Sequence, residues 1–240
     1  PFTFTEYLLL YRQYLFYFIY LIPESKIQPS KAMNKDAAKH IVWVDLEMTG
    51  LDIEKDHILE IACLVTDAQL NVVATGPNLI IHQPEEILKS MHPWCVAQHG
   101  ESGLTEASRK SNISLIKAEN QVLEFIKTHT PESKCPLGGN SVYMDRLFLR
   151  KYMPKVDEHL HYRIIDVSTI KELGKRWFQK EFSNIPQKKF KHRSMDDILD
   201  SIEELKYYRQ SMFKQYLSLH IRYIYIEICQ LLANGKDFMR

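Results

Sequence analysis

Residues 41–50 have the sequence IVWVDLEMTG, and this stretch decides the fold of the chain. Four apolar residues, 41–44, lead into Asp45 and Glu47 and then into a Thr-Gly pair that is typical of a turn. A continuous apolar run that ends in a turn indicates a strand buried on both faces of a sheet. We therefore expect a central strand here, with both acidic residues at its end.

The segments after this strand indicate an α/β fold. Residues 58–66 and 72–82 are rich in strand-forming residues and are separated by a short polar stretch, which indicates a hairpin meander. Residues 114–128 carry apolar residues at the spacing of one helix face, and Pro131 ends this helix. We also expect short strands at 135–140 and 162–165, and helices at 143–152, at 169–177 behind a capping box of Thr169 and Glu172, and from Ser194 onward. The first part of the chain contains consecutive strands, and in the later part strands alternate with helices. This order predicts a sheet of mixed direction flanked by helices.

The composition is that of an ordinary soluble domain. Hydrophobic residues make up 45% of the 240 residues and charged residues 25%, which argues against a disordered chain and a polytopic membrane protein. Thirty-one basic against 30 acidic residues leave a formal charge of +1, so any nucleic-acid substrate should be short or held locally. The four cysteines are scattered without a C-x-x-C pair, which argues against a zinc knuckle and against a disulfide framework. A reducing compartment fits this pattern best.

The two ends of the chain differ from its middle. Residues 7–22 form an aromatic-rich apolar run that is too short and too polar for a membrane span. Three interpretations stay open: extraneous or mistranslated sequence upstream of Met33, a divergent targeting segment, or a membrane anchor, and we expect no stable membrane association. Residues 220–229 fit a strand or a buried helix and receive no function. We expect an N-terminal extension at 1–36, one domain at 37–215 and a C-terminal extension at 216–240.

Asp45 and Glu47 are the first candidates for chemistry. They lie two residues apart at the end of the expected strand, so their side chains point to the same face of the sheet. Two carboxylates that close repel each other and require a cation. The alternative is that acidic residues at a strand end serve solubility alone.

Three later residues are weak candidates when each is taken alone. Asp145 lies on the helix expected at 143–152, where burial of an acidic residue is costly without a partner, although a solvated position would explain it equally well. Asp196 and Asp197 fall in the first turn of the last helix, where the helix dipole favours acidic residues without any further role. His192 lies in a basic loop just before that helix, where a histidine is usually a surface residue.

Together these residues form three motifs that resemble the histidine-bearing branch of the DEDD exonuclease superfamily. The motifs are residues 44–52 with Asp45 and Glu47, residues 139–141 followed by Asp145 and 148–149, and His192-Arg193 followed by residues 196–198. Within that branch, residues 43–51, 161–163, 166–169 and 207–209 resemble the oligoribonuclease family. The resemblance covers about residues 41–213. It implies a ribonuclease H-like fold, with a mixed central sheet flanked by helices, and makes 37–215 an exonuclease domain.

The resemblance also implies the chemistry of the site. The metal ligands would be Asp45, Glu47, Asp145 and Asp197, and the general base would be His192. Asp197 is preferred over Asp196 because the family's histidine precedes its metal-binding aspartate by five residues, as His192 precedes Asp197. Four carboxylates suit Mg²⁺ or Mn²⁺, and we expect two ions per active site, about 4 Å apart, to serve an in-line displacement at phosphorus.

The substrate contacts follow from the resemblance alone. Leu51 would wedge against a terminal base, and Trp94 and His99 would provide stacking surface. The alternatives are that Leu51 caps the core and that Trp94 is a buried anchor. The family positions that gather a 5′ phosphate are matched by Ser141, Tyr162, Arg163 and Ser168. Of these, Tyr162 and Arg163 would come from a second protomer, which implies a homodimer; a surface strand edge is their alternative.

The implied function is that of a 3′-to-5′ exoribonuclease, a hydrolase that degrades short single-stranded RNA, down to dinucleotides, to nucleoside 5′-monophosphates. We expect an intracellular protein, in the cytoplasm, the mitochondrion or both. One alternative is a related exonuclease that acts on longer RNA or DNA. The other is a catalytically silent RNA-binding homologue, since a fold does not guarantee a function.

Overall fold

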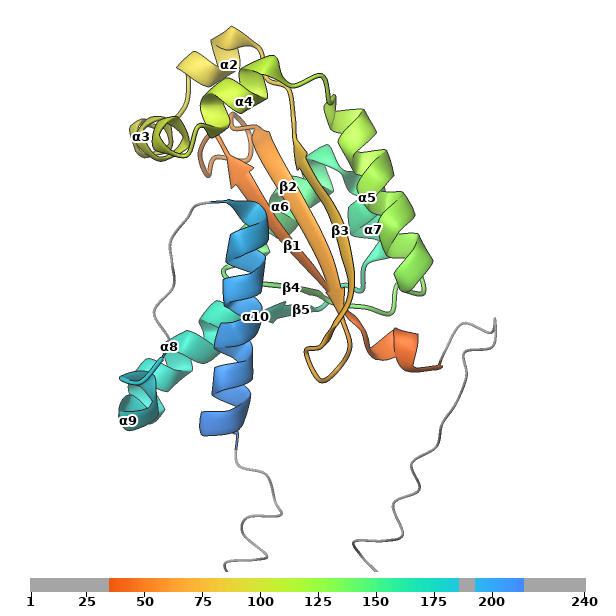
Figure 1. Ribbon diagram of the computed structural model, residues 1–240, viewed down its shortest axis with the longest axis vertical. Helices are drawn as coiled ribbons and strands as arrows, with labels where there is room; N and C mark the ends of the chain where they lie inside the picture. The colour runs from red at the N-terminus through yellow and green to blue at the C-terminus, as the bar shows by residue number, and fades with distance from the viewer. Residues whose placement is uncertain (1–34, 186–192, 214–240) are drawn as a thin grey trace, which may run out of the picture. The chain divides into compact units, whose positions relative to one another are not determined.

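The computed structural model describes residues 35–185 and 193–213, in which five strands form one sheet (Figure 1). The strands are β1 (Ile41–Met48), β2 (Ile58–Thr66), β3 (Val72–Ile80), β4 (Leu137–Gly139) and β5 (Ile164–Asp166), in the order β3-β2-β1-β4-β5. β1, β2 and β3 pair antiparallel, whereas β1, β4 and β5 pair parallel. The sheet is therefore mixed and β1 is its central strand, which confirms the predicted fold class.

Helices cover both faces of this sheet and one of its ends (Figure 1). They are the 3₁₀ helix η1 (Lys35–Lys39) and the α-helices α2 (Glu85–Lys89), α3 (Pro93–Glu101), α4 (Leu104–Lys110), α5 (Leu115–His129), α6 (Tyr143–Tyr152), α7 (Pro154–His159), α8 (Val167–Trp177), α9 (Gln179–Phe182) and α10 (Ser194–Ser211). None of the helices within the described residues has the length and apolar character needed to cross a membrane.

The side chains of β1 alternate between two hydrophobic clusters, one on each face of the sheet. Val42 and Val44 pack in a cluster with α5, α6 and α7. Ile41 and Trp43 pack in the other cluster, with the apolar face of α10. Burial on both faces explains why this strand has no polar residue before Asp45. By the same alternation, Asp45 and Glu47 lie on the α10 face, as predicted.

Gly138 allows β1 and β4 to lie close together. A Cβ atom on this residue would come within 2.8 Å of Ile41 Cγ2 and 3.3 Å of the Trp43 ring. The chain then turns through Ser141, whose φ of 52° lies in the left-handed region. This turn starts α6 next to the end of β1 and so brings Asp145 to the sheet.

Three details differ from the sequence prediction. The capping box of Thr169 and Glu172 is wrong, because α8 begins earlier and the side chain of Asp166 caps it by accepting from the Ser168 amide. Helices η1, α2, α3, α4, α7 and α9 lie in regions where no element was predicted. The strands expected at 72–82 and 162–165 end at Ile80 and begin at Ile164. The predictions for residues 7–22, His192 and residues 220–229 lie outside the described residues.

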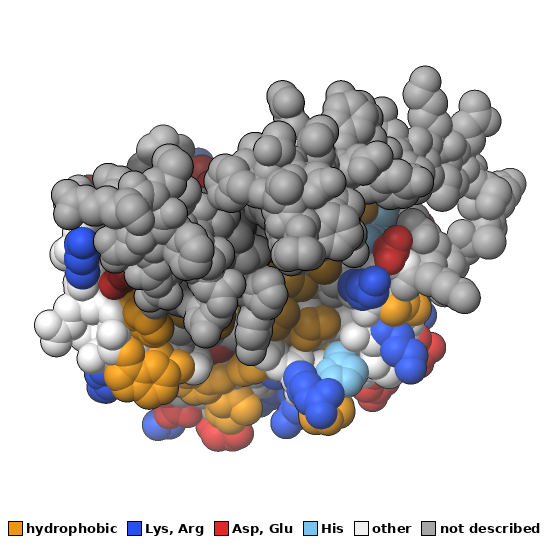
Figure 2. Space-filling model, turned by 90° about the horizontal axis from the view of Figure 1, so that it is seen from below, with side chains coloured by type: hydrophobic (Ala, Val, Ile, Leu, Met, Phe, Trp, Pro, Cys, Tyr) orange, Lys and Arg blue, Asp and Glu red, His pale blue; other side chains and the backbone are white. Residues whose placement is uncertain are grey.

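The surface carries charges of both signs. On the face seen from below in Figure 2, the visible part shows acidic and basic side chains interspersed with hydrophobic ones. This agrees with the net charge of +1. A substrate with few phosphates is consistent with such a surface.

Candidate active site

Three carboxylates from distant parts of the chain meet at the end of β1. Asp45 and Glu47 come from the strand, and Asp197 comes from the first turn of α10. One oxygen atom of each lies within 4.8 Å of an oxygen atom of the other two. They meet because α10 packs on β1 and β2 through Ile198 and Ile202, which fixes the start of the helix over the acidic end of the strand.

Asp145 lies beside this group of three, at the edge of β1. Strand β4 pairs with β1 only at Val42 and Trp43, so the edge of β1 beyond these residues is not paired by a strand. There the carboxylate of Asp145, in the first turn of α6, accepts a hydrogen bond of 2.9 Å from the backbone amide of Leu46. The side chain of Asp145 is thereby fixed next to the residue that lies between Asp45 and Glu47.

Burial and neighbouring charges raise the pKa values of three of these acidic residues. Burial, and then the charges of Asp145, Glu47 and Asp197, raise the pKa of Asp45 well above its usual range. Burial, followed by the charge of Asp197, raises the pKa of Glu47 to about 8. Burial raises the pKa of Asp145 to about 7 despite the hydrogen bond from Leu46. Asp45 and Glu47 therefore favour their protonated forms at neutral pH, and a bound cation would favour the ionised forms.

The chemistry of the donor atoms fits a divalent metal ion. The group offers only carboxylate oxygens, which hard cations such as Mg²⁺ and Mn²⁺ prefer, and it includes no thiolate or imidazole ligand among the described residues. A bound cation would favour the ionised carboxylates and so offset the repulsion that raises these pKa values. The residues present therefore fit a divalent ion.

The raised pKa values predict how the metal-free protein responds to pH. Between the ordinary Glu47 pKa of 4.5 and its folded-state pKa of about 8, the folded protein keeps a proton that the unfolded chain releases. The free energy of unfolding should therefore fall as pH rises through this window, by an amount on the order of a few kcal/mol. Denaturant unfolding in chelator at pH 5 and pH 8 measures this loss, and excess Mg²⁺ should restore stability at pH 8. In Glu47→Gln the loss should be smaller, and an equal loss would contradict the assignment.

The side chain of His99 lies next to Glu47. Its Nε2 atom lies 2.8 Å from the carbonyl oxygen of Met48, and its Nδ1 atom lies 3.9 Å from Glu47 Oε2. The side chain is almost completely buried. His99 thus lies beside Glu47 and also lines an apolar pocket, and its role as a stacking surface stays a prediction.

An apolar pocket opens directly beside Glu47. It has a volume of about 510 Å³, and its walls include Leu51 and Trp94. Both side chains face solvent, with 66% of Leu51 and 56% of Trp94 exposed. Their exposure argues against the alternatives in which Leu51 caps the core and Trp94 is a buried anchor. The remaining lining residues are Leu46, Glu47, Met48, Gly50, His92, Cys95 and His99.

Ser141 and Ser168 meet in a second, shallower pocket. Their hydroxyl oxygens lie 3.1 Å apart, and the backbone amides of both residues donate to Asp166 Oδ1. Tyr162 and Arg163 are not among the residues that line this pocket in the same chain. Instead, Tyr162 is 72% exposed, and the Arg163 guanidinium lies 4.9 Å from the centre of its ring.

One ion pair near the carboxylates was not predicted. Glu60, in β2, is fully buried and binds Arg193, the residue that precedes α10. A signal existed in the sequence, because Glu60 is the one acidic residue in the otherwise apolar segment 58–66. Its partner could not be named, since the two residues are far apart along the chain.

Comparison with known proteins identifies the family. A family model described as "Exonuclease" matches residues 42–205. The chain is 56% identical over 206 residues to the human protein "Oligoribonuclease, mitochondrial", covering 86% of this chain and 84% of that protein. It is 58% identical over 179 residues to "Probable oligoribonuclease" of Dictyostelium discoideum, covering 75% of this chain and 93% of that one. At the level of fold, it resembles Escherichia coli exonuclease I in complex with a dA16 oligonucleotide, with a TM-score of 0.54 and 14% identity over 72% of this chain and 41% of that chain. The chain belongs to the oligoribonuclease family of exonucleases.

Proposed function

We propose that this protein is a 3′-to-5′ exoribonuclease that hydrolyses short oligoribonucleotides, down to dinucleotides, to nucleoside 5′-monophosphates. The observation that supports it best is the meeting of Asp45, Glu47 and Asp197 within 4.8 Å, with Asp145 fixed beside them. The relatives' names include oligoribonuclease, and those of the human, bovine and mouse proteins add "mitochondrial". We extend the activity to this chain, together with an intracellular location in the mitochondrion, the cytoplasm or both.

The four carboxylates would hold two Mg²⁺ or Mn²⁺ ions. Such ions, when bound, would lower the pKa of an attacking water and neutralise charge on the leaving oxygen. The chain's own part is to hold acidic oxygens in place: Asp145 is fixed by the Leu46 amide, and Glu47 is supported by His99. His192 would accept the proton of the water near neutral pH, as an imidazole with an ordinary pKa of about 6.5 can.

The substrate would be held at both ends. Leu51 and Trp94 offer exposed apolar surface beside Glu47, on which the 3′-terminal base can stack. Stacking is sequence-tolerant, which suits an enzyme that degrades any short RNA. At the other end, the Ser141 and Ser168 hydroxyls can donate to a 5′ phosphate, joined by Tyr162 and Arg163 from a second protomer. Contacts at both ends would favour the shortest substrates.

The decisive assay measures hydrolysis of 5′-labelled RNA dinucleotides and of 20-residue RNA and DNA strands. The proposal expects rapid release of mononucleotides from the dinucleotide with Mg²⁺ or Mn²⁺, and none in chelator. A preference for the long strands would favour a related exonuclease of the same superfamily. Binding without hydrolysis under every metal condition would identify a silent RNA-binding homologue.

A mixing experiment tests the homodimer. Asp45→Asn removes a metal ligand, and the double variant Tyr162→Ala/Arg163→Ala removes the contacts that would come from the partner. Each variant alone should be nearly inactive on a dinucleotide. A refolded 1:1 mixture should recover about one quarter of the parent activity, because half of the dimers are mixed and each has one complete site. No recovery, with mixed dimers demonstrated by mass, would contradict a shared site.

A further inference from the structure

Glu60 lies in an unusual place for a carboxylate. It is in the middle of the sheet, has no exposed surface, and lies directly opposite Glu47 in the register of β1 and β2. Residues opposite each other in an antiparallel pair point to the same face of the sheet, so Glu60 faces the acidic group. Its charge contributes to the raised pKa of Glu47, after burial and Asp197. A buried acidic residue beside a proposed metal ligand is costly and requires a specific partner.

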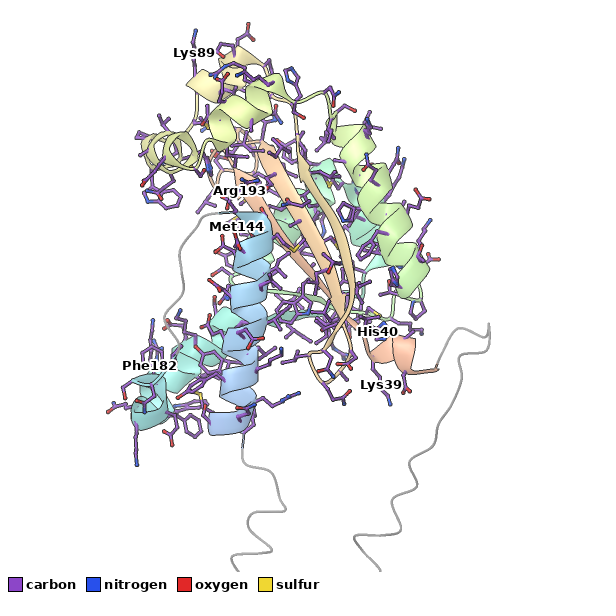
Figure 3. All side chains as sticks on the ribbon, in the orientation of Figure 1. Lys39, His40, Lys89, Met144, Phe182 and Arg193 are labelled. Carbon is purple, nitrogen blue, oxygen red and sulfur yellow. The ribbon has the colours of Figure 1, made fainter. Side chains whose placement is uncertain are left out.

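Arg193 is that partner. Its Nη2 atom donates to Glu60 Oε1 at 2.8 Å and its Nε atom donates to Oε2 at 3.0 Å, which is the two-pronged geometry of a guanidinium on a carboxylate. Figure 3 shows Arg193 at the N-terminal end of α10. Arg193 is also the N-cap residue of α10, and its side chain makes no cap hydrogen bond. The start of the helix is therefore tied to the sheet by the Arg193 side chain.

A short path connects this ion pair to Asp197. The backbone amide of Asp197 donates to the carbonyl oxygen of Arg193 at 3.1 Å, which is the first hydrogen bond of the helix. Starting from Glu47, the path runs across the strand pair to Glu60, through the ion pair to Arg193, and through this hydrogen bond to Asp197. Both ends of the path are carboxylates of the same group. The ion pair thus adds a polar contact, beside the packing of Ile198 and Ile202, between the strands and the start of α10.

We propose that Glu60 and Arg193 are positioning residues that hold Asp197 at ligand distance from Asp45 and Glu47. This inference rests on the proposed function, because it assumes that the carboxylates bind divalent ions. Its physical basis is that a bidentate ion pair between a strand and the N-terminus of a helix restricts movement of the helix along the sheet. Partners that orient metal ligands in this way typically contribute about ten- to a hundredfold to metal affinity.

The test measures Mn²⁺ binding to the protein without substrate, by electron paramagnetic resonance of free Mn²⁺. We expect Glu60→Gln, Arg193→Gln and Arg193→Lys each to raise the Mn²⁺ concentration for half-saturation about tenfold or more. Arg193→Lys is included because lysine keeps the charge and loses the fork. The double variant Glu60→Gln/Arg193→Gln should be no weaker than the worse single variant, since both remove the same interaction. The double variant leaves no unpaired charge in the protein interior. If Glu60→Gln does not fold, the double variant and Arg193→Lys still test the proposal.

One further measurement separates positioning from other roles. The KM for a dinucleotide at saturating Mn²⁺ should change little in all these variants. If Arg193→Gln instead raises KM while Glu60→Gln binds Mn²⁺ normally, Arg193 contacts substrate phosphate and the proposal is overturned. If Arg193→Lys binds Mn²⁺ as the parent does, charge alone matters and the proposal is also overturned. A parent protein that binds no Mn²⁺ would refute the proposed function itself.

A matched control lies on the same helix. Glu203 is exposed and pairs with Lys206 one turn later. Glu203→Gln makes the same chemical change as Glu60→Gln at a position away from the carboxylates. It should leave Mn²⁺ binding and hydrolysis at parent levels.

Discussion

Asp197→Asn is expected to lower the rate of dinucleotide hydrolysis at least about a thousandfold, and to raise the melting temperature of the metal-free protein. The rate falls because one of the proposed oxygen ligands loses its charge. The melting temperature rises because Asp197 contributes to the raised pKa values of both Asp45 and Glu47, so its neutralisation relieves repulsion. A gain of about 1 kcal/mol corresponds to roughly 2–4 °C for a protein of this size. Steady-state kinetics and thermal unfolding in chelator measure the two effects.

Asp196→Asn is the matched control for this prediction. It makes the same change one residue earlier, in the same first turn of α10. Asp196 is not in the group of three carboxylates whose oxygens lie within 4.8 Å of one another. Its rate should stay within a few-fold of the parent value. If Asp196→Asn were the inactive variant and Asp197→Asn the active one, the five-residue spacing from His192 would have selected the wrong aspartate.

His192→Ala is expected to lower the rate about a hundred- to ten-thousandfold while leaving metal binding intact. A general base contributes to proton removal from water and not to the ligand set, so rate and metal affinity should separate in this variant. In the parent, the rate should rise with pH through about 6.5, as a base loses its proton, and this rise should disappear in the variant. His82→Ala, at an exposed position, is the control. Full activity of His192→Ala would exclude the histidine as base.

The parts of the fold that follow from local pattern were predictable. The apolar run before Asp45 indicated a central strand, and its alternation placed Asp45 and Glu47 on one face. The helix predicted at 114–128 is α5, with Ser114 capping the Lys117 amide. These features depend on residues that are close together along the chain, so they can be predicted from a single sequence.

Other parts depend on short elements or on residues that are distant along the chain. Helices α2, α3 and α4 have five, nine and seven residues, too few for a clear periodic pattern. The start of α8 was missed because Asp166 both ends β5 and caps the helix. The burial of His99 and the pairing of Glu60 with Arg193 arise only when separate elements pack together. The meeting of Asp45, Glu47 and Asp197, with Asp145 beside them, was expected from the family's motifs and not from periodicity.

The acidic group draws its members from β1, α6 and α10, and α10 is the last helix of the described chain. No fragment that ends before α10 contains all four of the proposed metal ligands. Asp197 is made after the whole of the sheet, because β5 ends at Asp166. Under the proposed function, a chain still emerging from the ribosome would therefore lack hydrolytic activity until α10 has docked on β1 and β2.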